Sequence, residues 1–95
     1  MEKIKVVRMH DSTWRNIYGK VIRKEYCYYI AIRRFWLFWV PVRFDTPLSI
    51  SSILNAEKVY FSFVPYRSAA YKFRYEAEAI RVKFDILQNP NKYCR

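Results

Sequence analysis

Basic and aromatic residues are interleaved over residues 23–43 of this 95-residue chain. Planar rings can stack on the bases of a single-stranded nucleic acid, while lysine and arginine contact its phosphates. An open face of a β-sheet that carries aromatic rings is one way to build such a site. The residues that this chemistry would use are five cations and three rings, namely Arg23, Lys24, Arg33, Arg34, Arg43, Tyr29, Trp36 and Trp39.

The same residues allow two other interpretations. The rings can instead form a hydrophobic core, with the arginine stems packed around its rim, and the chain holds no RNP1 pattern that would point to RNA. Tyr, Trp and Arg also dominate the energetic centres of protein interfaces. A protein partner, or a second copy of the chain that extends the sheet, therefore stays open beside nucleic acid.

The charge balance limits the kind of partner. The chain has 18 Lys and Arg against 8 Asp and Glu, which gives a formal net charge of +10. A positive potential of this size attracts polyanions, so nucleic acid, an anionic membrane surface and an acidic protein are all candidates. The charge can also serve only to keep a chain with 20% aromatic residues in solution.

No set of residues has the spacing of a catalytic or metal site. His10 is the only histidine and lies in a polar stretch, where we expect a solvated turn without a nucleophile. Cys27 and Cys94 with one histidine do not supply four zinc ligands, although a bridge between the two thiols stays open. Glu76 and Glu78 point about 200° apart on a helix and cannot form a carboxylate pair. We therefore predict no enzyme activity, no metal and no cofactor.

Alternating patterns predict most of the sheet. Residues 3–9 alternate basic and apolar side chains and predict a first strand. A polar turn is expected at residues 10–12, and residues 14–18 could form a short second strand before a bend near Gly19. Residues 26–33 and 37–44 predict a hairpin that turns at residues 33–35.

The faces of residues 26–33 can be assigned from the period of two. One face is expected to lie in the core and carries Tyr26, Tyr28, Ile30 and Ile32. The opposite face carries Cys27, Tyr29, Ala31 and Arg33. The Arg33-Arg34 pair also argues against a membrane-spanning helix here, because each arginine costs a few kcal/mol at the bilayer centre.

The second half of the chain predicts a strand between two helical segments. Residues 48–56 fit one or two helical turns capped by Ser49, or a packed loop. Residues 58–64 predict a strand with its odd positions inward. A helical stripe then follows and predicts the buried face of a C-terminal helix, carried by Ala69, Phe73, Ala77, Ile80, Phe84 and Leu87. We favour a start of this helix near Arg74 rather than Ser68, and an end at Asn89-Pro90.

These elements predict one α+β domain over residues 1–95. Its core would be an antiparallel sheet of about four strands with a C-terminal amphipathic helix packed on one face. The first residues, MEKIKVV, do not form a secretory signal, so we expect a cytoplasmic protein.

Two segments carry a resemblance to a group of known proteins. They are the Tyr-rich strand Tyr26–Ile30 followed by Phe35-Trp36, and the helix opening at residues 73–79, FRYEAEA. This order resembles small hairpin-plus-helix proteins of tailed bacteriophages and their gut-bacterial hosts, in which Phe-x-Thr/Ser-x-x-Glu-Ala opens the helix. Tyr75 stands here in place of the capping Thr or Ser, and residues 47–66 look like an insertion. The resemblance covers about half the chain and implies a phage or accessory origin, in the host cytoplasm, with no defined activity.

Overall fold

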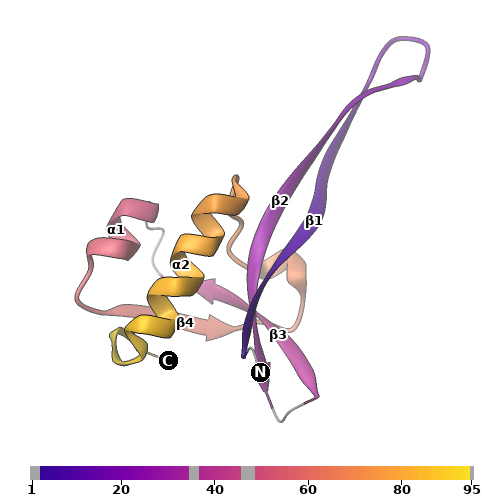
Figure 1. Cartoon of the computed structure of the whole chain (residues 1–95). Helices are drawn as coiled ribbons and strands as arrows, with labels where there is room; N and C mark the ends of the chain where they lie inside the picture. The colour runs from indigo at the N-terminus through magenta and orange to yellow at the C-terminus, as the bar shows by residue number, and fades with distance from the viewer. Residues whose placement is uncertain (1–2, 35–36, 46–48, 95) are drawn as a thin grey trace.

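Over the residues that the structure describes, the chain folds into a five-stranded sheet with two α-helices on one of its faces (Figure 1). The computed structural model describes residues 3–34, 37–45 and 49–94. The strands lie side by side in chain order: β1 (Ile4–Arg15), β2 (Val21–Arg34), β3 (Phe38–Phe44), β4 (Val59–Phe63) and β5 (Tyr93–Cys94). The helices are α1 (Ile50–Asn55) and α2 (Glu76–Gln88), and short 3-10 turns occupy Arg67–Ala69 and Pro90–Lys92.

The predicted α+β class is confirmed, and the predicted sheet is partly wrong. β1, β2, β3 and β4 pair antiparallel, as expected. The sheet is nevertheless mixed and has five strands, because the chain returns after α2 and places β5 parallel to β4. Only two residues take part in that last pairing, which is too short a pattern to be seen in the sequence.

The first two strands form a hairpin much longer than the rest of the sheet. β1 and β2 pair from Ile4–Ile32 to Arg15–Val21, whereas β3 pairs with β2 only over Ala31–Arg34. The outer half of the hairpin, residues 10–26, therefore projects away from the body as a two-stranded ribbon that we call the arm (Figure 1). The radius of gyration is 15.0 Å, against about 12 Å for a compact chain of this length.

The predictions for residues 10–18 are wrong. Residues 10–12 are part of β1 rather than a turn, because Asp11 forms a bulge that lets the pairing continue past it. Residues 14–18 are not a separate strand, since Trp14 and Arg15 end β1 and the turn follows at residues 16–20. Both faces of the arm are exposed to solvent. Its sequence therefore lacks the alternation of apolar and polar residues by which a half-buried strand is recognised.

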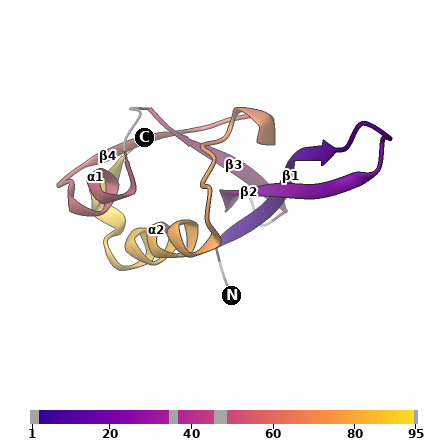
Figure 2. The ribbon, with the colours of Figure 1, turned by 90° about the horizontal axis from the view of Figure 1, so that it is seen from above.

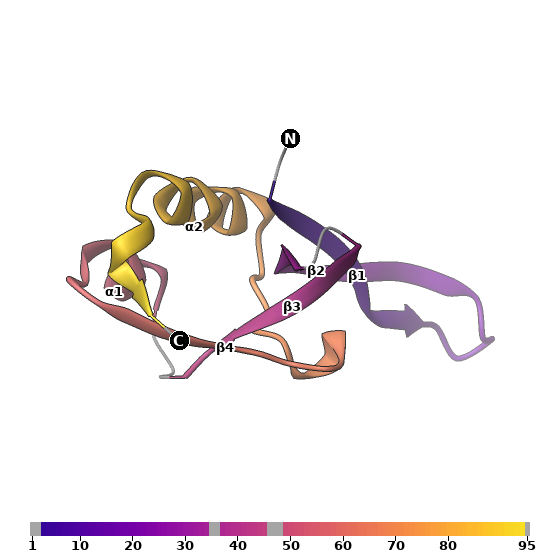
Figure 3. The same cartoon turned by 90° about the horizontal axis from the view of Figure 1, so that it is seen from below.

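The main core joins side chains of the sheet, of α1 and α2, and of the segment before α2. Figures 2 and 3 show from opposite sides that both helices lie on one face of the sheet. Its most deeply buried side chains come from distant parts of the chain, namely Ile30, Val42, Ile53, Val59, Phe73 and Val82. Of the predicted core face of β2, Ile30 is buried and Tyr28 and Ile32 pack against the cluster. Tyr26 is exposed because it already belongs to the arm.

A second, smaller cluster covers the other face of the sheet. Tyr29 and Ala31 of β2 are buried there against Val64 and Ala70, from the segment that follows β4. Figure 3 shows this segment on the side of the sheet away from α2. β2 is thus covered on both faces where it crosses the body, which explains why both faces of residues 26–33 are rich in apolar residues.

The later start of the C-terminal helix is confirmed, but its buried face is not the predicted one. α2 begins at Glu76, with Tyr75 as an N-cap that makes no side-chain capping bond. Ala79 and Val82 are fully buried, whereas Phe84 is 53% and Leu87 49% exposed. The predicted stripe included residues 69 and 73, which lie before the helix. Extending their spacing into α2 selected the wrong face of the helix.

The shorter elements of the second half agree with the predictions. Ser49 caps α1, and its hydroxyl accepts a hydrogen bond from the Ser52 amide at 3.2 Å. In β4, Val59 is buried, Phe61 and Phe63 are half-buried, and Tyr60 between them is exposed.

A partly buried ionic cluster fastens the end of α2 to the body. The Asp85 carboxylate accepts hydrogen bonds from the Lys92 ammonium at 2.7 Å and from the Tyr93 hydroxyl. The Lys92 ammonium also donates to the Leu54 carbonyl at 3.0 Å, at the end of α1. Burial raises the pKa of Asp85, but the bonds from Lys92 and Tyr93 outweigh it and leave the pKa below its ordinary value. This cluster joins α1, α2 and β5.

We predict that Asp85→Asn lowers the free energy of unfolding by about 1–3 kcal/mol at neutral pH, because the nearly buried Lys92 ammonium loses its counter-charge. A carboxylate with a depressed pKa stabilises the fold above its unfolded value of about 4, and this contribution is lost as the pH falls through the folded value. Urea unfolding at neutral and strongly acidic pH measures the effect, with the exposed Asp45→Asn as control. An equal loss at both pH values would contradict this account.

Candidate nucleic-acid interface

The structure divides the predicted site residues between distant places. Arg23 and Lys24 lie on the arm, whereas Arg33, Arg34 and Trp39 lie at the opposite end of β2. Ten residues of extended strand separate Lys24 from Arg34, which is about 33 Å. Arg43 is exposed on β3 opposite Ser62, and Trp36 lies outside the described residues. The seven described residues therefore do not form one surface.

Tyr29 cannot serve as a stacking ring. Its side chain is only 8% exposed and belongs to the second hydrophobic cluster. The prediction placed Tyr29 on an open face of the sheet, but the segment that carries Val64 and Ala70 covers this face. For this residue the core interpretation holds.

Trp39 is half-buried between the second cluster and two cations. The Lys5 ammonium lies 4.4 Å from the centre of its ring, and the Arg33 guanidinium carbon lies 6.0 Å away. Arg34 is placed in the same way over Phe63, at 4.4 Å. These cations lie over the rings of Trp39 and Phe63, while Phe38, which pairs with Arg34, is 61% exposed.

The arm presents both charge and an accessible ring. Between Ser12 and Lys24 the chain has four basic residues and no acidic one. Those residues, Arg15, Lys20, Arg23 and Lys24, are all exposed. Arg23 pairs with Glu25 at 2.8 Å, but this ion pair is exposed and contributes little.

Trp14 is an exposed aromatic residue of the arm that was not named from the sequence. It is 53% exposed on the arm and lies directly opposite Arg23, whose guanidinium carbon is 5.4 Å from the ring centre. On the other face of the arm, Arg8 lies over the Tyr26 ring at 4.6 Å. Only the hairpin register brings these cation and ring pairs together, so the sequence carried no local signal for them.

The turn at the end of the arm is held by its own hydrogen bonds. The Asn16 side-chain oxygen accepts from the amides of Tyr18 at 2.9 Å and Lys20 at 3.0 Å. The Gly19 amide donates to the Asn16 carbonyl, and Gly19 has a φ of 79°, a conformation that favours glycine. The Arg15 guanidinium donates to the Gly19 carbonyl at 2.9 Å. The bend expected near Gly19 is confirmed, and the turn has one defined shape.

We predict that Asn16→Ala loosens the turn without unfolding the body. Two amides lose their acceptor, and a hydrogen bond of about 1 kcal/mol corresponds to about a fivefold change in protection. Hydrogen exchange should therefore become about fivefold faster at Tyr18 and Lys20 and stay unchanged at Ile30 in the core. Unchanged exchange at Tyr18 and Lys20 would show that the Asn16 side chain does not hold the turn.

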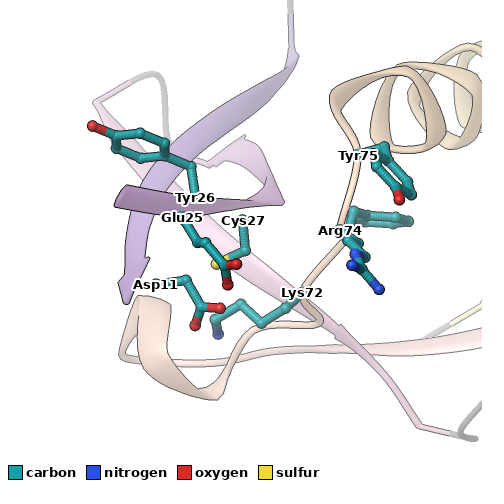
Figure 4. A pocket seen from close by; sticks show the side chains of 8 residues that line it. Asp11, Glu25, Tyr26, Cys27, Lys72, Arg74 and Tyr75 are labelled. Atoms are coloured by element: carbon teal, nitrogen blue, oxygen red, sulfur yellow. The ribbon is translucent and has the colours of Figure 1, made fainter. Parts of the chain in front are cut away.

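An open cleft of about 580 Å³ lies where the arm leaves the body. Figure 4 shows Asp11, Glu25 and Cys27 on the arm side, facing Lys72 and Tyr75 from the segment before α2. The Lys72 ammonium donates to the carbonyls of residues 67, 68 and 70, so its position is fixed by that turn. The cleft mixes both signs of charge and does not favour an anion.

The cysteines do not supply chemistry to this cleft. Burial, and then the charge of Asp11, raise the pKa of the Cys27 thiol, which therefore stays protonated at neutral pH. Cys27 and Cys94 are both free thiols, so the bridge left open by the sequence is not formed. Within the described ranges, no three His, Cys, Asp or Glu side chains are grouped so that they could hold a metal ion. His10 lies on the arm, with its Nε2 2.6 Å from the Thr13 hydroxyl.

Comparisons of the chain with protein-family models, curated proteins and solved structures found no match. The resemblance to small bacteriophage and gut-bacterial proteins therefore stays a prediction. In the part of the chain that the structure covers, no helix is both long and apolar enough to cross a bilayer.

Proposed function

We propose that this protein is a non-enzymatic nucleic-acid-binding protein and that the arm contacts the polymer. The observation that supports this is the projecting ribbon itself, which carries four exposed cations and no acidic residue between Ser12 and Lys24. Cations spaced along an extended element can neutralise successive phosphates, and each such contact releases condensed counterions. An arm that stands clear of the body can approach a polymer without a steric clash.

We further propose that the exposed ring of Trp14 contacts a base of the nucleic acid, while the cations of the arm contact its phosphates. Stacking on an accessible aromatic ring stabilises single-stranded DNA or RNA by about 1–3 kcal/mol per base. Trp14 and Arg23 share one face of the arm, and Lys24 with Thr13 lies on the other. Trp14 thus takes the role that the sequence assigned to Tyr29 and Trp39. The single strand expected from the sequence remains the first probe, with a duplex beside it.

We predict that Lys20→Ala/Lys24→Ala weakens binding to a single-stranded oligonucleotide and lowers its salt dependence. Each lost phosphate contact reduces the slope of log K against log salt by about 0.7, so the pair should reduce it by about 1.4. Fluorescence anisotropy at several salt concentrations measures this slope.

Two further double variants locate the site. Lys58→Ala/Arg81→Ala removes the same charge from exposed positions of the body and should leave the slope nearly unchanged. Arg33→Ala/Arg34→Ala removes it from the far end of β2. If only this last variant lowers the slope, the arm is not the contact surface. If the native chain does not bind at low salt, the proposed function is wrong.

A second candidate function is supported by the outer face of α2. Ala77, Phe84 and Leu87 are exposed and, with the half-buried Ile80, form a row at spacings of three, four and three. This is the spacing of a helix that packs against another helix. The alternative is therefore an interaction module, with a second copy of the chain as partner.

We predict for this alternative that the protein forms a dimer at high concentration and that Phe84→Ser/Leu87→Ser keeps it monomeric, because the apolar row is lost. Sedimentation velocity over a range of concentrations measures the association. Tyr60→Ser, at an equally exposed ring on β4, serves as control and should still dimerise. A native chain that stays monomeric at every concentration would rule out the dimer.

A further inference from the structure

The turn of the arm carries the two most exposed large apolar side chains of the described residues. Ile17 is 91% exposed and Tyr18 is 86% exposed. Ile22, just behind them, is also largely exposed. Phosphate binding by the cations does not require these groups, and exposed apolar side chains that cluster mark an interaction site.

These side chains stand on a turn that is already ordered. The Asn16 side chain binds two amides of the turn, and the Arg15 guanidinium holds the Gly19 carbonyl. A turn with a defined shape loses little conformational entropy when its side chains enter a partner. The turn is therefore built to present Ile17 and Tyr18, not to bury them within the chain.

The surroundings of the turn indicate the chemistry of the partner. Arg15 and Lys20 flank the two apolar side chains, and Arg23 and Lys24 follow along the ribbon. An apolar tip between cations complements a stack of bases between two phosphate backbones. A two-stranded ribbon fits the major groove of a duplex, whereas the minor groove is only about 6 Å wide. From the minor-groove side, therefore, only the side chains of the turn need to enter the duplex.

We propose that Ile17 and Tyr18 form a wedge that inserts between neighbouring base pairs of a duplex and kinks it. This inference rests on the proposed function and specifies its substrate as a duplex with a base step that can be opened. Apolar side chains that enter a step from the minor groove unstack it and bend the duplex by about 20–90°. The flanking cations hold the backbones on either side.

The experiment measures binding and bending separately. A DNA duplex of about 25 base pairs with a flexible TA step at its centre carries a donor and an acceptor dye at its ends. We expect the native chain to raise energy transfer, as a kink toward the upper part of the range of about 20–90° would, because it brings the two ends closer together. Ile17→Ser/Tyr18→Ser should abolish this rise, while its affinity for the duplex falls by less than about tenfold, because the four cations remain.

A control variant and two further probes make the outcome decisive. Phe84→Ser/Leu87→Ser removes exposed apolar side chains from α2 and should leave the bend intact. Binding of the native chain without bending, or bending that survives Ile17→Ser/Tyr18→Ser, overturns the wedge and leaves the proposed function standing. Absence of binding to both the duplex and a single strand at low salt overturns both. Flotation with phosphatidylserine vesicles that depends on Ile17 and Tyr18, without duplex bending, assigns the turn to a membrane surface and also overturns the wedge.

Discussion

The fold depends on the pairing of β1 with β2 over nearly the whole of both strands. A two-stranded ribbon on its own is at best marginally stable in water. The inner half of this ribbon is fixed because Ile30 enters the main core on one face while Tyr29 and Ala31 enter the second cluster on the other. The outer half has no such cover and continues the hydrogen-bonded ladder that the inner half anchors. The projection of the arm is thus a consequence of burial elsewhere.

The same constraint explains why β2 carries two kinds of residue. Where it crosses the body, from Cys27 to Ala31, its side chains are small or apolar, because they must fit against cover on both faces. Before Tyr26, in the arm, the strand has the sequence Val-Ile-Arg-Lys-Glu over residues 21–25, and these side chains are exposed or half-buried. The change occurs beside the Tyr28–Phe73 bridge, the point at which the segment before α2 meets the strand. The second half of β2 therefore contributes to the hydrophobic core, and its first half forms part of the exposed arm.

The elements that could be predicted were those in which the alternation of apolar and polar residues follows the buried and exposed sides of the element. The pairing of β2 with β3, the strand β4, the Ser49 cap and the start of α2 all have a local pattern that sterics and burial impose. The turn expected at residues 33–35 was wrong, because Arg33 and Arg34 still belong to β2 and pair with Trp39 and Phe38. The arm could not be predicted, because a solvated ribbon places no constraint on which side chains alternate. The prediction of the buried face of α2 was wrong for a different reason. Phe73 is buried in the main core but belongs to the extended segment before α2, so its helical spacing to the residues of α2 is a coincidence.

The residues named for the site were not brought together by the fold. Pairs of a cation and a ring do occur, but mostly at other residues, as Trp14 with Arg23, Tyr26 with Arg8, and Trp39 with Lys5. The rings named from the sequence lie in the apolar run of residues 26–43, and in a chain of 95 residues such a run supplies side chains to the hydrophobic core. Trp14, from a polar segment, is accessible because residues near the end of an arm have no core to enter.

The exposed tip of the arm is the feature that burial does not explain. Ile17, Tyr18 and Ile22 stay in water, where such side chains favour association. Their neighbours Arg15, Lys20, Arg23 and Lys24 oppose association between copies by repulsion, which fits the net charge of +10. We propose that a tip of this composition fits an anionic partner that also offers an apolar surface. Charge alone would not require the apolar side chains, and exposure alone would not require the cations.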